Sequence, residues 1–226
     1  MNYRIQEILK MLIPGVILVS CLYLLLVKEK YPENPFDKDM ISLVIIIFLV
    51  VSYVCGYFID WFGSIFERLY YKSFPRPSEL MFNDNSANPK YRVQLVKKEK
   101  IIEYLCLVLQ KSSQHPLSKD NALKLFKLAN YLKDRNTSVA VKERLNELYF
   151  TKIFSRNVMM TFLTMFVCYM LIILFGVFGW VSQINLSSSI FITIPFFVMS
   201  MIRWRETAFY YSRAVLYAAC EDVLKP

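Results

Sequence analysis

The sequence has little of the material from which catalytic and metal-binding sites are usually built. It contains a single histidine, His115, and only five glycines among 226 residues. It has no glycine-rich phosphate loop, no H-E-x-x-H zinc motif and no G-x-S-x-G nucleophile motif. We therefore expect a protein that is not an enzyme and that carries neither a cofactor nor a metal ion.

Closely spaced cysteines are also absent. The chain has five cysteines, and no two of them form a C-x-x-C pair: Cys21, Cys55, Cys106, Cys168 and Cys220. Such pairs are typical of zinc sites and of redox-active disulfides. We expect neither a zinc site nor a disulfide framework.

Charge is missing from four apolar stretches, which are residues 12–27, 41–59, 158–180 and the shorter 190–202. A bilayer core about 30 Å thick is crossed by about 20 apolar helical residues. The second and third stretches are long enough alone, and the first and fourth become so if they begin near residues 8 and 186. This pattern predicts an all-α polytopic membrane protein with four transmembrane helices and a cytoplasmic helical insert between helices two and three.

The predicted domains follow from these stretches. Residues 1–65 hold transmembrane helices over about 8–27 and 41–62, and residues 66–156 form the basic helical insert. Residues 157–202 hold transmembrane helices over about 158–180 and 186–202. A cytoplasmic C-terminal helix, 203–226, completes the chain and should pack on the insert through Phe209, Leu216 and Cys220.

Lysine and arginine near the ends of membrane helices indicate orientation, because they are retained on the cytoplasmic side. They flank helix one at its start, helix two at its end, helix three at its start and helix four at its end, as in Arg4, Arg76, Arg156 and Arg203. The loop 181–189 has no charge. We expect a multi-pass protein of the bacterial inner membrane with both termini in the cytoplasm.

The net charge of +9 is concentrated in the insert, where residues 66–156 hold 18 lysines and arginines and nine acidic residues. Anionic lipid headgroups attract such a domain, and the bilayer is its expected partner. Nucleic-acid binding is the less favoured alternative.

Within the insert, residues 75–89 are predicted to form a loop. Helices are expected over 91–111, over 118–133 after an N-cap at Ser118, and from 139 straight into the membrane after a cap at Thr137 or Ser138.

Ionisable residues near the inner ends of helices two and four are the candidate gating residues. Asp60 and Glu67 lie on one stripe of helix two, and Arg203 and Arg213 lie on one stripe below helix four. If the two helices run side by side, Asp60 is level with Arg203 and Glu67 with Arg213. Such pairs either fix helix packing only or take part in gating. If the Asp60–Arg203 pair lies among the headgroups, its loss should cost on the order of 1 kcal/mol.

Small residues on helix two are candidate packing positions. Gly56 and Gly63 lie two turns apart on nearly one face, where another helix can approach closely. We expect this face to form subunit contacts in a symmetric homo-oligomer.

The layout resembles small multi-helix membrane effectors and accessory proteins of bacterial antiviral defence systems, such as those beside retrons, CRISPR systems or the Kiwa system. The resemblance is carried by size, four spans, the basic insert and aromatic–basic runs at 56–71 and 203–217. It implies that a cytosolic partner, encoded nearby, detects infection and that this protein then alters or organises the inner membrane.

Two functions follow from the sequence. The first is an oligomeric inner-membrane effector whose cytoplasmic insert receives a signal and whose spans then perturb the membrane. The alternative is an anchor or scaffold whose basic insert recruits a cytosolic protein or a nucleic-acid complex. Loss of membrane potential on signalling distinguishes the first from the second.

Overall fold

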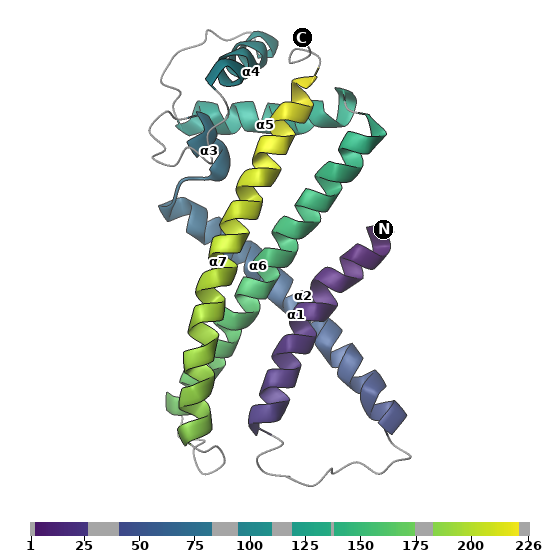
Figure 1. Ribbon diagram of the computed structural model, residues 1–226, viewed down its shortest axis with the longest axis vertical. Helices are drawn as coiled ribbons and strands as arrows, with labels where there is room; N and C mark the ends of the chain where they lie inside the picture. Colours follow the sequence, from purple (N-terminus) through teal and green to yellow (C-terminus); the bar gives the residue numbers. More distant parts are fainter. Residues whose placement is uncertain are drawn as a thin grey trace. The chain divides into compact units, whose positions relative to one another are not determined.

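The computed structural model of the protein consists of helices throughout the residues that it describes (Figure 1). These residues are 3–26, 41–82, 95–109, 119–136, 138–174 and 183–221. Their helices are α1 (Tyr3–Leu26), α2 (Ile41–Ser73), α3 (Pro77–Phe82), α4 (Leu95–Val108), α5 (Lys119–Asn136), α6 (Val139–Leu174) and α7 (Gln183–Ala219). The all-helical class predicted from the sequence is confirmed for this part of the chain.

The chain divides into two compact units. Unit 1 comprises Met1–Arg68 and Ile153–Trp204, and unit 2 comprises Leu69–Lys152 and Arg205–Pro226. The divisions fall within α2, α6 and α7, so each of these helices contributes residues to both units.

Three of the described helices, α1, α2 and α6, are long and apolar enough to cross a membrane. The fourth predicted span lies in α7, which is not among them. Its apolar stretch from Ile190 to Ile202 is followed at once by Arg203 and Arg205. At 1.5 Å per residue this stretch covers roughly 20 Å, which is shorter than the bilayer core.

Unit 1 packs through narrow stripes. On α2, the buried positions Ser52, Gly56, Ile59 and Gly63 recur every three or four residues and form one face. Phe162 of α6 stacks on Phe196 of α7 with ring centroids 5.4 Å apart. The first part of α2, from Ile41 to Val51, has exposed large apolar side chains on all sides, which suits contact with lipid or with another apolar surface.

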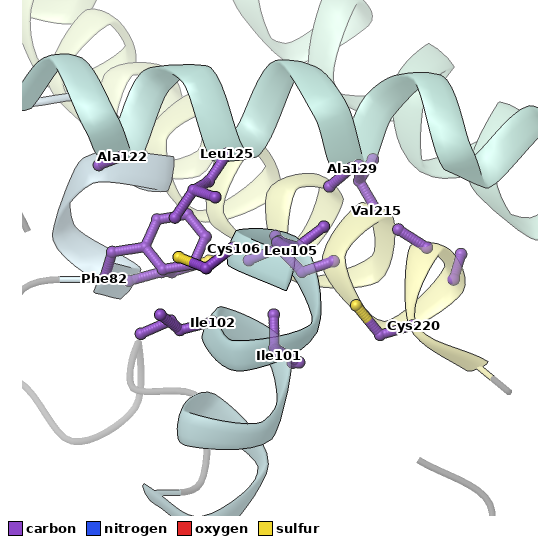
Figure 2. Close-up of a cluster of buried hydrophobic side chains, with 14 of the residues drawn as sticks. Phe82, Ile101, Ile102, Leu105, Cys106, Ala122, Leu125, Ala129, Val215 and Cys220 are labelled. Carbon is purple, nitrogen blue, oxygen red and sulfur yellow. The ribbon is translucent and has the colours of Figure 1, made fainter. Parts of the chain in front are cut away.

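Unit 2 has its own hydrophobic core (Figure 2). Apolar residues of α3, α4, α5, α6 and α7 form it, among them Phe82, Leu105, Leu125, Leu145 and Leu216. The predicted packing of the C-terminal helix is confirmed within this unit, because Phe209, Leu216 and Cys220 are all buried in the core. On each helix the core residues recur at helical spacing and form one apolar face. Burial of these faces stabilises helices that are too short to be stable alone.

The short helix α3 lies in the stretch predicted to be a loop, and that expectation is wrong for residues 77–82. Pro77 occupies the first helical position, where its missing N–H is not needed. The backbone N–H of Arg76 donates to Oε2 of Glu79 at 3.2 Å, which is the return bond of a capping box. Burial of Met81 and Phe82 then fixes the helix on the core.

Other helix boundaries agree with the sequence only in part. Helix α4 ends at Val108, before the predicted end at 111, and α5 continues to Asn136, beyond the predicted end at 133. The hydroxyl of Ser138 accepts a hydrogen bond from the N–H of Val141 at 3.5 Å, so Ser138 is the N-cap of α6. From there α6 runs without a break to Leu174. The predicted cap at Ser118, the single histidine and the predicted helical residues 91–94 lie outside the described residues.

We expect Cys220 to be unreactive in the folded protein. Burial raises the pKa of its thiol to about 12, and its side chain is almost fully buried. At pH 8 the Cys220 peptide should remain unmodified by iodoacetamide in mass spectrometry and react once the protein is denatured. Because folding disfavours the thiolate, this cysteine should lower the free energy of unfolding as pH rises from about 9 towards 12. Cys220→Ala should reduce that decline, and rapid labelling of the native protein would contradict the burial.

Candidate functional site

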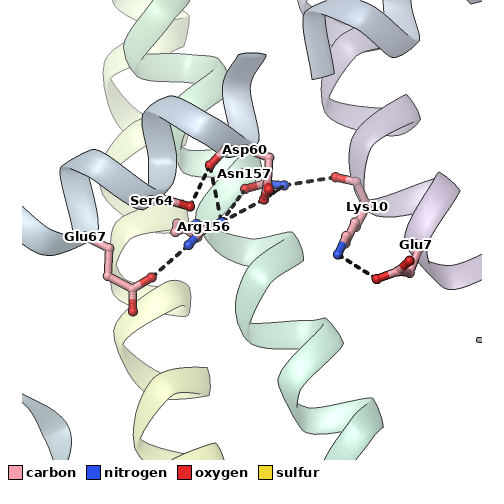
Figure 3. A network of polar contacts seen from close by, with 7 residues as sticks. All are labelled: Glu7, Lys10, Asp60, Ser64, Glu67, Arg156 and Asn157. Atoms are coloured by element: carbon pink, nitrogen blue, oxygen red, sulfur yellow. Dashed lines mark hydrogen bonds and ion pairs between the residues drawn. The ribbon is translucent and has the colours of Figure 1, made fainter. Parts of the chain in front are cut away.

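The polar centre of unit 1 is a single buried arginine of α6 (Figure 3). Nη2 of Arg156 donates to Oδ1 of Asp60 at 2.7 Å, and Nη1 donates to Oε2 of Glu67 at 2.9 Å. Asp60 and Glu67 lie two turns apart on α2, so one guanidinium spans both carboxylates. Its side chain is 8% exposed, against 24% for Asp60 and 18% for Glu67.

Asn157 connects this arginine pair to α1. Its Nδ2 donates to Oδ1 of Asp60 at 3.0 Å and to the backbone carbonyl of Lys10 at 3.2 Å. The Lys10 carbonyl is available because the residue four positions later is Pro14, which has no N–H to donate to it. Asn157 therefore supplies the donor that the proline removes from α1.

Thr161 continues the same contact one turn further along α6. Its hydroxyl lies 2.9 Å from the carbonyl of Asn157 and 3.5 Å from the carbonyl of Pro14. Both Asn157 and Thr161 are fully buried. We call the group of Asp60, Glu67, Arg156 and Asn157, with the Lys10 carbonyl, the Arg156 cluster; it joins α1, α2 and α6.

The electrostatics of the Arg156 cluster are incompletely balanced. One guanidinium faces two carboxylates, and the nearby Lys10 ammonium is paired with Glu7 at 3.3 Å. Nε of Arg156 is buried without a hydrogen-bond partner in the described part of the chain. A buried ion pair is weak evidence for stability, because desolvation offsets much of the attraction. Removing one charged residue nevertheless leaves its partner buried without a neighbouring charge of opposite sign.

Gly56 and Gly15 allow α1 and α2 to touch through their backbones. A Cβ atom added to Gly56 would collide with the backbone carbonyl of Met11, and one added to Gly15 would collide with that of Ser52. At Gly63 the fit is tight but involves side chains and not backbone: an added Cβ would lie 3.0 Å from Nε of Arg156 and 3.3 Å from Cγ of Met160.

The expectation that Gly56 and Gly63 face a second subunit is therefore wrong. Both glycines are buried, Gly56 against α1 and Gly63 against α6 of the same chain. The spacing of the glycines correctly indicated that a helix approaches closely there, but it did not indicate which helix.

The predicted partners of Asp60 and Glu67 are also corrected. Both carboxylates bind Arg156, rather than Arg203 and Arg213. From the sequence we expected α2 to pair with α7, and we expected Arg156 only to set the orientation of the chain in the membrane. Arg213 lies in unit 2 with its guanidinium over the ring of Tyr217, 5.5 Å from the centroid. Arg203 is exposed and lies next to Trp204, which is fully buried in unit 1.

Four residues of this site were not predicted from the sequence: Arg156, Asn157, Lys10 and Pro14. The sequence carried a signal for Pro14, Arg156 and Asn157. Pro14 lies in the middle of an apolar helix, so a carbonyl four residues earlier must find another donor. The neighbouring polar residues Arg156 and Asn157 stand at the edge of an apolar run, where Asn is a suitable donor.

Comparison of the chain with protein-family models, with curated proteins and with solved structures found no match. The function of the protein is therefore inferred from the contacts within this chain.

We expect Gly56→Ala to destabilise the protein far more than Gly63→Ala. The Gly56 variant places a methyl group against backbone that cannot move without separating α1 from α2, and overpacking of this kind costs about 1–3 kcal/mol. At Gly63 the methyl group would crowd the side chains of Arg156 and Met160, which need to shift by only a few tenths of an ångström, and a gain in helix propensity of about 1 kcal/mol offsets part of that cost. Thermal unfolding in detergent compares the two variants. Equal melting temperatures would contradict the close contact at Gly56.

We expect Arg156→Ala to lower the free energy of unfolding by about 3–5 kcal/mol, because Asp60 and Glu67 lose their shared partner. Asp60→Ala should cost less, since Glu67 still neutralises the arginine, but more than the roughly 1 kcal/mol typical of exposed pairs. The matched control is Arg144→Ala, an exposed arginine on the same helix. Unfolding in a detergent series measures all three variants. An Arg156 variant as stable as the control would show that the cluster contributes nothing to packing.

Proposed function

We propose that the protein is a bacterial inner-membrane effector that perturbs the bilayer when its cytoplasmic unit is signalled. In this proposal α7 is the fourth transmembrane helix, both termini are cytoplasmic, and unit 2 is the cytoplasmic part. The resemblance to antiviral membrane effectors supplies the setting, with infection as the signal and a partner encoded nearby as the sensor.

The observation that carries this proposal is the Arg156 cluster. Asp60 lies 19 residues after the start of α2, or about 30 Å along the helix. In the proposed topology this distance corresponds to the inner interface of the bilayer. Apolar side chains would hold helices together at such a position without the cost of desolvating a charge. An ionisable group found there is therefore a candidate for function. The guanidinium of Arg156 joins α6 to α2, and the amide of Asn157 joins α6 to α1. Loss of the guanidinium therefore weakens the α2–α6 contact directly and leaves Asn157 as the polar contact to α1.

A second observation concerns the exposed apolar half of α2. From Ile41 to Val51 most side chains are exposed among the residues that the structure describes, unlike the face from Ser52 to Gly63. In a bilayer this half is free to contact lipid or another copy of the chain. If the effector is a homo-oligomer, this half of α2 replaces the Gly56–Gly63 face as the expected subunit contact.

The alternative function is an anchor or scaffold, and the independent core of unit 2 favours it. A helical unit with its own buried core is a suitable docking domain for a cytosolic protein. A scaffold has no need for a releasable polar cluster among its membrane helices. Nucleic-acid recruitment is the less favoured form of this alternative and predicts affinity that falls steeply with salt.

We expect Arg156→Ala to depolarise bacterial cells in the absence of any signal, because it removes the group that holds α2 to α6. A potential-sensitive dye measures this after induction, with protein amounts in the membrane fraction matched. Lys142→Ala, which removes an exposed charge from the same helix, should leave the potential at the wild-type level. The double variant Asp60→Asn, Glu67→Gln removes both carboxylate charges with little change in volume, and it should also depolarise. Well-inserted Arg156 and double variants with normal potential would overturn the effector proposal and favour the scaffold.

The topology in this proposal is checked with the same expression system. Reporter fusions at Phe36 and Asn185 should give periplasmic signals, and fusions at Gln114 and after Pro226 should give cytoplasmic signals. A periplasmic signal at Gln114 would place unit 2 on the wrong side for a cytosolic signal.

A further inference from the structure

Unit 2 has a groove between α6 and α7 with a volume of about 490 Å³. On α6 its lining residues include Arg144, Leu145 and Leu148, and on α7 they include Tyr210, Arg213 and Tyr217. Sites for small molecules in proteins have volumes of about 300–1,000 Å³ and combine an apolar lining with a few placed polar groups. The groove has the size and the composition of such a site.

Two of the three charged groups of the groove are cationic. Neither Arg144 nor Arg213 forms an ion pair with any residue that the structure describes. The guanidinium of Arg213 lies over the ring of Tyr217, 5.5 Å from its centroid, which limits its orientations. Glu221 contributes one carboxylate, so two arginines and one glutamate leave a charge of +1. Planar guanidinium groups bind phosphates and carboxylates through paired hydrogen bonds.

The remaining surface of the groove suits a flat apolar group. Leu145 and Leu148 face a helix on which Ala214 and Ala218 take little space. Tyr210 is 40% exposed, which leaves part of its ring available for contact. Aromatic rings stack on flat partners in offset or edge-to-face arrangements, and nucleic bases are partners of this kind.

We propose that this groove binds a nucleoside phosphate, with the phosphates at Arg144 and Arg213 and the base against Tyr210 and the leucines. The charge complementarity selects an anion, and the aromatic and leucine lining selects one that carries a flat ring. The binding site goes beyond the proposed membrane function, and it does not depend on whether the protein perturbs the bilayer.

The test is equilibrium dialysis of the purified full-length protein in detergent against the four ribonucleoside triphosphates, with inorganic triphosphate and the free nucleosides as comparisons. At least one nucleotide should bind saturably and more tightly than inorganic triphosphate. Arg144→Ala and Arg213→Ala should each weaken binding about tenfold or more, as expected for the loss of a charge-assisted hydrogen bond. Tyr210→Ala should weaken nucleotide binding and leave the weaker binding of inorganic triphosphate unchanged.

Arg205→Ala is the matched control. Arg205 is also on α7 and also lies near a tyrosine ring, 5.9 Å from the centroid of Tyr70, but it does not line the groove. Its replacement should leave binding unchanged. The proposal is overturned if none of the four nucleotides binds saturably, if the Arg144 and Arg213 variants bind as the wild type does, or if Arg205→Ala weakens binding equally. Inorganic triphosphate that binds as tightly as every nucleotide would overturn the part assigned to the base.

Discussion

One guanidinium, that of Arg156, is shared by two carboxylates of α2, and the packing of unit 1 depends on this sharing. Three helices that are apolar enough to enter a membrane gain no hydrophobic free energy from meeting one another in lipid. They must instead be held by close packing and by polar contacts. Arg156 supplies the polar contact to α2, and its neighbour Asn157 extends that contact to α1.

Proline and glycine in α1 and α2 make the same arrangement possible. Pro14 leaves the Lys10 carbonyl without its helical donor, and an amide from α6 takes the vacant position. One residue later, Gly15 meets the backbone of α2 at Ser52. A polar contact and a close backbone contact therefore occur within one turn of α1. A change that separates the helices at one of them also strains the other.

Much of the fold was predictable from the sequence, because helix-forming patterns and breakers are local signals. The absence of breakers indicated the continuous α6, residue type indicated a cap at Thr137 or Ser138, and spacing indicated the buried face of the C-terminal helix. Helix α3 was missed because its prolines and polar neighbours were read as a loop, although Pro77 and Glu79 together form a helix-start signal. Partners were harder to predict. Asp60, Glu67 and the glycines were recognised as contact positions, but periodicity shows which face of a helix is in contact and not which helix contacts it.

The basic charge of the chain has several separate roles, and this limits what net charge alone can indicate about function. Arg156 is buried and neutralised by carboxylates, so it contributes nothing to an attractive surface. Lys133 donates to the hydroxyl of Tyr211 at 3.1 Å, and Lys152 lies 5.9 Å from the centroid of the same ring. Arg144 and Arg213 line a groove. A surface that binds nucleic acid through counterion release needs its cations arrayed along one accessible path. Cations that are divided between an internal ion pair, a tyrosine ring and a groove support selective contacts with small anions better than they support a general polyanion surface.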